Sequence, residues 1–397
     1  MFSVQTTQKL TKISVSQICR FASTFKCSEL SIVECKKRKT VPTKDFGFGK
    51  YFTDHMLTIP WNIKDGWGKP KIEPYGPMQL VPSIKAIQYA VATFEGMKAF
   101  RGVDGKVRLF RPDKHSERFL RSVDRLAFPL FDGEEFVKCL KALIRLDEPW
   151  VPHGRGEALY IRPCMFSTDP AVGLDLSKEA ALSILLCPVA PFFDTGNKGV
   201  SLYADPKYVR AWEGGCGSFK LSSNYAPALY VQRLTNERNC QTALWLYGPD
   251  ELVTEAGTMN IFVFWTNEHG EKELITAPLT GLILPGITRM SILELTRGWN
   301  EFKVSEREFS MKQLLAAIKE KRLHCMFGTG TACVISPVAE IVYRDQSYKL
   351  PVEKKEDQLT LRIYNALADI QYAVNGPHPW LAPIDEELSH RKSAVSS

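Results

Sequence analysis

The pattern of apolar and polar residues predicts a chain that mixes helices with strands. Phe119, Val123 and Leu126 recur at helical spacing, which predicts an amphipathic helix. A second amphipathic helix is predicted through Phe136 and Leu140, with Leu143 on the same face. The predicted strands are 160–163, 182–188, 242–247, 260–265 and 274–277, and further predicted helices are 288–298, 310–321 and 357–373. The expected fold class is therefore mixed α/β, of the α+β type.

The length of the chain predicts two domains. Its 397 residues exceed the roughly 250–300 at which a single core stops growing. Pro, Gly and Asn concentrate between Pro188 and Gly199, which is typical of a domain junction. We expect a leader at 1–28, a basic arm at 29–44, a small N-terminal α/β domain at 45–188, a linker at 189–199, a large C-terminal domain at 200–380 and a loose tail at 381–397.

The excess of positive charge lies at the start of the chain. Residues 1–44 hold nine Lys or Arg against Glu29 and Glu34, which accounts for the whole net charge of +7. The neutral remainder gives no electrostatic reason to bind nucleic acid. Residues 1–28 contain no Asp or Glu and are rich in Ser and Thr. We therefore predict a transit peptide, cleaved near 20–23, and a mitochondrial matrix location. A merely disordered tail is the alternative, and 36–39 is expected to be a solvated arm.

Membrane and metal chemistry are not predicted. No apolar run approaches the roughly 20 residues that a membrane helix requires. The ten cysteines are scattered without a C-x-x-C pair or a Cys/His cluster, so we expect no zinc site and no disulfide framework.

One lysine and one glutamate stand out as candidate catalytic groups. Lys220 lies in G-G-C-G-S-F-K-L-S-S-N-Y, and Glu255 follows 35 residues later in E-A-G-T-M-N-I-F. An amine that adds to an aldehyde needs close backbone approach and a nearby group that manages charge. A carboxylate in a tight turn can face a heteroaromatic ring. The pair predicts pyridoxal 5'-phosphate rather than a metal or a nicotinamide.

A phosphate site is predicted where Pro285 and Gly286 turn the chain into a helix. The free amides at that helix start would face an anion, and Arg118 would supply a guanidinium. Taken alone, Arg118 is more often one of three solvated arginines on its helix, with Arg121 and Arg125, and Pro-Gly alone is a turn. The Gly-rich loop at 327–332 lacks the order of a dinucleotide site; its amides hold a carboxylate or form an ordinary turn.

These motifs together resemble a known family. From Glu255 the chain reads E-x-G-x-x-N-I-F, then L-x-T at 274–276 and L-x-G-I-x-R at 284–289, which is similar to the class IV aminotransferase signature. F-E-G-M-K-A-F at 94–100, Y-I-R-P at 160–163 and F-G-T-G-T-A-C at 327–333 extend the similarity. Over about 45–380 the chain resembles eukaryotic branched-chain amino-acid aminotransferases of the mitochondrial type. D-amino-acid aminotransferase and aminodeoxychorismate lyase share this fold but are shorter and lack F-E-G-M-K-A-F.

The resemblance implies a fold-type IV enzyme with the cofactor between two domains. Lys220 would form the imine with the cofactor and shuttle the proton, and Glu255 would face the pyridine nitrogen. The other implied cofactor contacts are Tyr225 at the phenolate oxygen, Leu284 on the ring face, and Arg118, Thr258, Ile287 and Thr288 at the phosphate.

The resemblance also implies the substrates: L-leucine, L-isoleucine or L-valine, with 2-oxoglutarate and L-glutamate. Arg162 would bind the distal carboxylate of glutamate. The implied pocket residues are Phe48, Tyr89, Phe94, Tyr160, Thr258, Met259, Thr331 and Ala332. Val172 and Leu174 resemble a loop that a second subunit places over the site, so a homodimer is expected.

Three positions differ from the family pattern. Cys333 is followed by Ser336 instead of completing C-x-x-C, so we predict no thiol switch. Phe192 replaces a pocket tyrosine, and Ser222-Ser223 replaces Gly-Gly. Two other functions stay open: transamination of a D-amino acid or elimination from a chorismate derivative, and a silent paralogue, which would have lost Lys220, Glu255 or Arg118.

Overall fold

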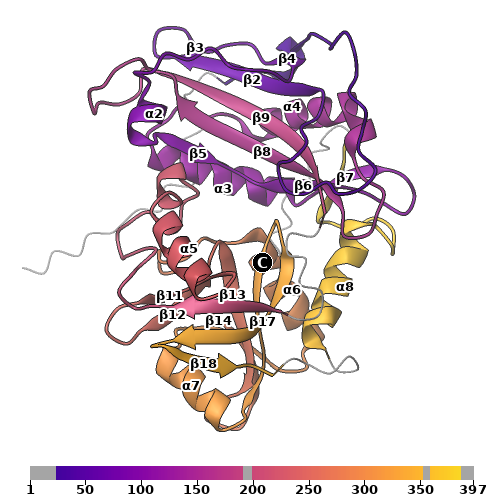
Figure 1. Ribbon diagram of the computed structural model, residues 1–397. Helices are drawn as coiled ribbons and strands as arrows, with labels where there is room; N and C mark the ends of the chain where they lie inside the picture. The colour runs from indigo at the N-terminus through magenta and orange to yellow at the C-terminus, as the bar shows by residue number, and fades with distance from the viewer. Residues whose placement is uncertain (1–23, 191–198, 352–357, 386–397) are drawn as a thin grey trace, which may run out of the picture.

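The structure, a computed structural model, describes residues 24–190, 199–351 and 358–385. Two sheets lie one above the other in Figure 1. The N-terminal sheet has ten strands in the order β1-β4-β2-β9-β8-β6-β7-β19, with β3 paired to β2 and β5 to β8. The C-terminal sheet has nine strands in the order β12-β11-β10-β17-β16-β13-β14-β15, with β18 paired to β17. The chain passes from the N-terminal sheet to the C-terminal sheet between Val189, where β9 ends, and Val200, where β10 begins.

The N-terminal sheet is antiparallel except for the β1–β4 pair, and three helices accompany it. Its elements are β1 (Ser31–Ile32), β2 (His55–Asn62), β3 (Gly66–Trp67), β4 (Lys71–Pro74), α2 (Lys85–Tyr89), β5 (Ala92–Phe94), β6 (Met97–Arg101), β7 (Val107–Phe110), α3 (Pro112–Arg125), α4 (Gly133–Leu146), β8 (Ala158–Ser167), β9 (Glu179–Val189) and β19 (Leu381–Pro383).

The C-terminal sheet mixes parallel and antiparallel pairs. Its elements are β10 (Val200–Ala204), α5 (Ala228–Glu237), β11 (Thr242–Tyr247), β12 (Leu252–Ala256), β13 (Met259–Thr266), β14 (Lys272–Thr276), α6 (Ile287–Trp299), β15 (Lys303–Glu306), α7 (Met311–Lys319), β16 (Leu323–Gly330), β17 (Val334–Tyr343), β18 (Gln346–Lys349) and α8 (Leu359–Gln371). Short 3-10 turns are η1 (Cys27–Glu29), η2 (Glu148–Trp150) and η4 (Ser222–Asn224).

The periodic patterns of the sequence correspond to these elements. α3 and α4 bury Phe119, Val123, Phe136 and Leu140 against the N-terminal sheet, as the helical spacing predicted. α7, where a helix was predicted at 310–321, begins with a capping box, in which Gln313 N donates to the Ser310 side chain. Each fully buried large apolar side chain contributes about 1.5–3 kcal/mol, so these faces fix how the helices lie on the sheets.

One apolar cluster contains residues of both sheets and joins them. It combines Phe100 and Tyr160 of the N-terminal sheet with Phe262 and Phe327 of the C-terminal sheet and Leu367 of α8. Phe262 and Phe327 stack with ring centroids 5.2 Å apart. Because this cluster is shared, the surfaces that face each other between the sheets are held in a fixed relation, and the candidate site lies there.

The last residues of the predicted leader, 24–28, pack against the N-terminal domain. Phe25 is 1 % exposed and packs against Trp67 and Phe131, with ring centroids 5.2 and 5.5 Å away. The Cys27 amide donates to Glu135 Oε2 at 2.7 Å. Residues 24–28 therefore belong to the N-terminal domain, because Phe25 fills a core position that the composition of the leader did not reveal. Residues 1–23 lie outside the described residues.

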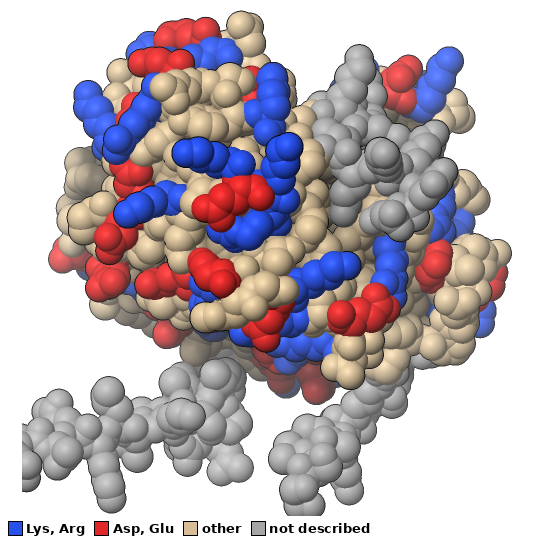
Figure 2. Space-filling view, turned by 90° about the horizontal axis from the view of Figure 1, so that it is seen from below, with Lys and Arg blue, Asp and Glu red and all other residues tan. Residues whose placement is uncertain are grey.

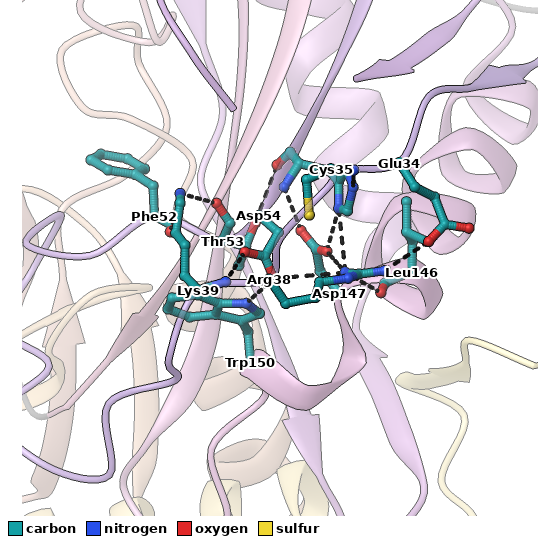
Figure 3. Close-up of polar contacts among 11 residues, drawn as sticks. Glu34, Cys35, Arg38, Lys39, Phe52, Thr53, Asp54, Leu146, Asp147 and Trp150 are labelled. Atoms are coloured by element: carbon teal, nitrogen blue, oxygen red, sulfur yellow. Dashed lines mark hydrogen bonds and ion pairs between the residues drawn. The ribbon is translucent and has the colours of Figure 1, made fainter. Parts of the chain in front are cut away.

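The basic arm is exposed and is also hydrogen-bonded to the N-terminal domain. Arg38 Nη1 lies 2.9 Å from Asp147 Oδ1, and the same carboxylate oxygen lies 2.7 Å from His55 Nδ1 (Figure 3). Lys39 Nζ donates to the carbonyl of Thr53 at 2.7 Å, and its amide donates to Asp54 Oδ1 at 2.8 Å. These charged hydrogen bonds hold the arm against the surface of the N-terminal domain, while residues 36–39 stay exposed to solvent.

Two further expectations are corrected at the ends of strands. β19 pairs with β7, so Leu381–Pro383 form an edge strand of the N-terminal sheet and not the start of a loose tail. The Gly-rich segment at 327–332 is only partly a loop, because Phe327 to Gly330 lie in β16. Phe192 falls outside the described residues.

The surface of the described chain carries both signs of charge. On the face in Figure 2, blue and red side chains are interspersed. Within the described residues, no helix is both long and apolar enough to cross a membrane.

Candidate active site

Lys220 lies where the two halves of the molecule meet. Its backbone is bonded to the N-terminal domain: the amide donates to Ser122 Oγ at 2.9 Å, and the carbonyl accepts from the Phe94 amide at 3.1 Å and from Thr93 Oγ1 at 2.9 Å. The side-chain Nζ lies 3.3 Å from the Tyr225 hydroxyl and 4.9 Å from the centre of the Phe94 ring. The predicted pair of Lys220 and Tyr225 is thus in direct contact, beside an aromatic wall.

Glu255 lies on β12 with its carboxylate buried. Oε1 accepts from Asn260 Nδ2 at 2.9 Å and from the Leu284 amide at 3.1 Å. Oε2 is 2.8 Å from Arg210 Nη1 but is a buried acceptor without a hydrogen bond. Burial raises the pKa of Glu255, and the charge of Arg210 opposes that rise. An unsatisfied buried oxygen of this kind fits a ring N–H as its donor.

The start of α6 provides an anion site. Gly286 is the residue before the helix, and the first amides that follow it have no partner within the helix. Its lack of a side chain is required, because a Cβ there would lie 2.0 Å from Asn260 Oδ1. Arg118 Nη1 donates to the Pro285 carbonyl at 3.2 Å. Ile287 and Thr288 are buried in the first turn of α6.

Arg118 is therefore not one of the solvated arginines of α3. Its Nε donates to Glu95 Oε2 at 2.9 Å, and its Nη2 contacts Glu95 Oε1. His115 Nδ1 lies 3.1 Å from the same oxygen. Glu95 and His115 were missed by the sequence analysis. The signal was available in F-E-G-M, where a glutamate is enclosed by apolar residues and needs a buried cation.

The predicted substrate residues form a connected aromatic wall. Phe48 packs on Tyr160 with ring centroids 4.8 Å apart. Arg162 Nη2 donates to the Tyr160 hydroxyl at 3.0 Å, and its guanidinium lies 4.6 Å from the Phe94 ring centre. Phe94 in turn lies 5.0 Å from the Tyr225 ring. Arg162 Nε is buried and has no hydrogen-bond partner, so the guanidinium retains a free donor.

The turn between β16 and β17 is hydrogen-bonded to Lys98. The Nζ of this buried lysine donates to the Ala332 carbonyl at 3.0 Å, and burial lowers the pKa of Lys98 to about 8. Thr331 and Ala332 lie in the turn itself, partly exposed. On the neighbouring turn, Thr258 is exposed and Met259 is buried against Gly328, whose Cβ would lie 2.8 Å from the methionine sulfur.

Three predicted residues form a separate cluster on the surface. Tyr89 donates from its hydroxyl to the Val172 carbonyl, and both side chains are exposed. Leu174 is 80 % exposed. Among the described residues, no cluster of His, Cys, Asp or Glu has the make-up of a metal site.

Comparison with known proteins decides the family. Residues 92–341 match the family described as "Amino-transferase class IV". The chain belongs to this family. It is 47% identical over 353 residues to the cytosolic branched-chain-amino-acid aminotransferase of Mus musculus, covering 88% of this chain and 92% of that protein. It is 45% identical over 363 residues to the mitochondrial enzyme of the same organism, covering 91% and 92%.

Solved branched-chain aminotransferases have the same fold. The branched-chain aminotransferase of Thermoproteus uzoniensis, solved with norvaline, aligns with a TM-score of 0.63 at 22% identity over 83% of this chain and 99% of that one. The Escherichia coli enzyme aligns with a TM-score of 0.64 at 20% identity over 83% and 100%. The predicted fold-type IV architecture is confirmed.

Proposed function

We propose that this class IV aminotransferase transfers the amino group of L-leucine, L-isoleucine or L-valine to 2-oxoglutarate, giving the branched 2-oxo acid and L-glutamate, with pyridoxal 5'-phosphate as cofactor. The observation that carries the proposal is the buried, unsatisfied Glu255 Oε2 in the same interdomain site as the Lys220 amine. The relatives at 45–47% identity are named for branched-chain substrates, which supports the choice of substrate.

The residues of the site fit pyridoxal phosphate. The bound cofactor supplies an electron-accepting ring and an aldehyde. Glu255 would accept a hydrogen bond from the protonated ring nitrogen and so keep that nitrogen cationic, and the Leu284 side chain would pack on the ring face. Lys220 carries the proton to and from the substrate Cα, and Tyr225 lies next to its amine. The phosphate would be bound by Arg118 and the start of α6, with Thr258, Ile287 and Thr288.

The substrate side of the site combines apolar walls with two carboxylate binders. Phe48, Phe94 and Tyr160 enclose a branched aliphatic side chain. Thr331 and Ala332 offer turn amides for the α-carboxylate, and the bond from Lys98 holds the turn in place. Arg162 has a free buried donor and binds the distal carboxylate of glutamate, so one pocket serves both amino donors.

Steady-state kinetics test the substrate. With 2-oxoglutarate as acceptor, all three branched L-amino acids are expected to react, with kcat/KM values within about 10–200-fold of each other, because one methylene in an apolar pocket is worth only ~1–3 kcal/mol. D-alanine serves as the control and is expected to give no turnover. A preference for D-alanine over L-leucine would contradict the proposal.

The proposed working unit is a homodimer. An exposed apolar surface surrounds α2, and we name it the α2 patch: Met78, Leu80, Val81, Ile87, Tyr89, Val172, Leu174 and Leu176. Lys85, which is buried, ties its two segments together through Asp169 at 2.8 Å and the carbonyl of Asp175 at 3.0 Å. On the same side of Figure 1, α5 exposes Leu229 and Tyr230. A second copy of the chain is the partner we propose for this exposed apolar surface.

Substitution within the α2 patch tests the dimer. Leu174→Asp is expected to weaken self-association at least about tenfold, since a buried charge at an interface costs more than 1.4 kcal/mol. Sedimentation velocity across a dilution series of the full chain measures this. Val103→Asp is the matched control, because Val103 is 70% exposed but lies outside the patch. The dimer is excluded if the wild-type protein sediments as a monomer at every concentration.

We also propose import into the mitochondrial matrix. The support is compositional: the first 28 residues contain no Asp or Glu and are rich in Ser and Thr. Relatives include cytosolic as well as mitochondrial enzymes, and the cytosol is the alternative. Because Phe25 is a core residue, cleavage must fall before it, which agrees with the neighbourhood at 20–23.

A further inference from the structure

Arg210 connects the parts of the site, although no motif drew attention to it. Its side chain is 9% exposed, and its Nη1 lies 2.8 Å from Glu255 Oε2. The same nitrogen donates to the carbonyls of Gly217 at 3.2 Å and Leu282 at 3.3 Å. A single guanidinium thus contacts three segments that are far apart in the sequence.

Each of these three segments contains a residue of the site, and the first is Glu255 itself. Gly217 lies three residues before Lys220, and Leu282 lies two residues before Leu284. The two loops pack closely, because a Cβ on Gly217 would lie 2.8 Å from the Gly281 carbonyl and 2.9 Å from that of Leu282. Arg210 is the cation at their junction. Its position therefore sets how the lysine loop lies relative to the loop that carries Leu284.

Arg210 is also the cation in direct contact with Glu255. Burial raises the pKa of Glu255, and Arg210 opposes this most strongly, with smaller contributions from Lys220 and Arg289. Arg289 itself is bound to Glu306 and the Ala277 carbonyl, both at 2.8 Å. A guanidinium does not lose its proton in the working range of an enzyme, so the charge beside Glu255 is permanent.

We propose that Arg210 is a positioning residue for transamination, which holds Glu255 anionic and aimed into the site while it joins the lysine loop to the loop of Leu284. The inference rests on the proposed binding of pyridoxal phosphate. Arg210 does two separate things here. Its charge acts on Glu255, and the donors of its Nη1 fix the two loops.

Two variants separate these contributions. Arg210→Met removes both the charge and the donors, whereas Arg210→Lys keeps the charge but replaces the planar guanidinium with an ammonium on a shorter side chain, which does not place a donor where Nη1 lies. The matched control is Arg307→Met: Arg307 Nη2 lies 2.8 Å from the buried Glu273, so the control removes an arginine from a buried glutamate of the same domain, outside the site. The full-length proteins are loaded with pyridoxal phosphate, and the visible band of the bound cofactor is titrated with pH.

Arg210→Met is expected to raise the pH midpoint of that band by about one unit, because loss of a nearby positive charge favours the protonated forms of all groups beside it. Retention of the cofactor is expected to weaken about tenfold, and kcat to fall with little change in KM, as for a group that acts in the transition state. Arg210→Lys is expected to keep the wild-type midpoint but to retain the cofactor less well. Arg307→Met is expected to match the wild type in both the pH midpoint and the retention of the cofactor.

The outcomes are distinguishable. An unchanged midpoint and unchanged cofactor retention in Arg210→Met would reduce Arg210 to a packing residue and overturn the inference. A shifted midpoint in Arg210→Lys would overturn the electrostatic part. A wild-type protein that takes up no pyridoxal phosphate would overturn the proposed function itself, together with this inference. Urea midpoints of all the variants show whether a loss is only one of stability.

Discussion

Replacing Lys220 with alanine is expected to reduce transamination at least about a thousandfold, since general acid–base catalysis by one positioned side chain is worth 10²–10⁴ and this amine also anchors the cofactor. The amine lies 3.3 Å from Tyr225 and above the Phe94 ring. The other buried lysine near the site, Lys98, is bonded to the Ala332 carbonyl and does not replace it. The structural cost is small, because the backbone of Lys220 makes the contacts with Ser122 and Thr93.

Reductive trapping gives a test that does not depend on activity. Borohydride treatment of the wild-type protein with pyridoxal phosphate, followed by peptide mass mapping, is expected to find the cofactor on Lys220. Lys207→Ala is the control, because Lys207 is exposed in the same half of the chain. Label on another residue, or wild-type turnover by Lys220→Ala, would exclude the assigned role.

Local features of the fold were readable from the sequence because their causes are local. Helical spacing identifies α3 and α4, and the capping box at Ser310 identifies the start of α7. Lys220 and Glu255 were found in the same way, from the small residues around them. Each of these features depends on residues within a few positions of one another.

Long-range pairings were not readable. Arg210 meets Glu255 across 45 positions, Arg38 meets Asp147 across 109, and β19 pairs with β7 from the opposite end of the chain. A basic residue looks the same in the sequence whether it is solvated or paired, and only the tertiary fold supplies its partner. The structure therefore changed the interpretation of arginines more than that of apolar residues.

Glu95→Gln is expected to lower the free energy of unfolding by about 3 kcal/mol, because it leaves the buried Arg118 without its counter-charge. Glu95 is fully buried and contacts both Arg118 and His115. The same loss frees the guanidinium that reaches the Pro285 carbonyl, so weaker retention of pyridoxal phosphate is also expected. Urea unfolding of the holoenzyme measures the stability. Glu117→Gln, on the exposed face of α3, is the control and is expected to change it by no more than about 0.5 kcal/mol.

The effect of Glu95→Gln depends on pH in a direction that identifies its cause. Burial alone would raise the pKa of Glu95, but the charge of Arg118 and the hydrogen bond from His115 hold it well below the ordinary value of 4.5. A carboxyl whose pKa is lower in the folded state stabilises the protein above its unfolded pKa, and this contribution is lost as the pH falls. The difference between wild type and variant is therefore expected to be constant above about pH 5.5 and to shrink by about 1 kcal/mol for the next unit below pH 4.5. A difference that stays the same from pH 7 to pH 3.5 would mean that Glu95 acts through packing and not through its charge.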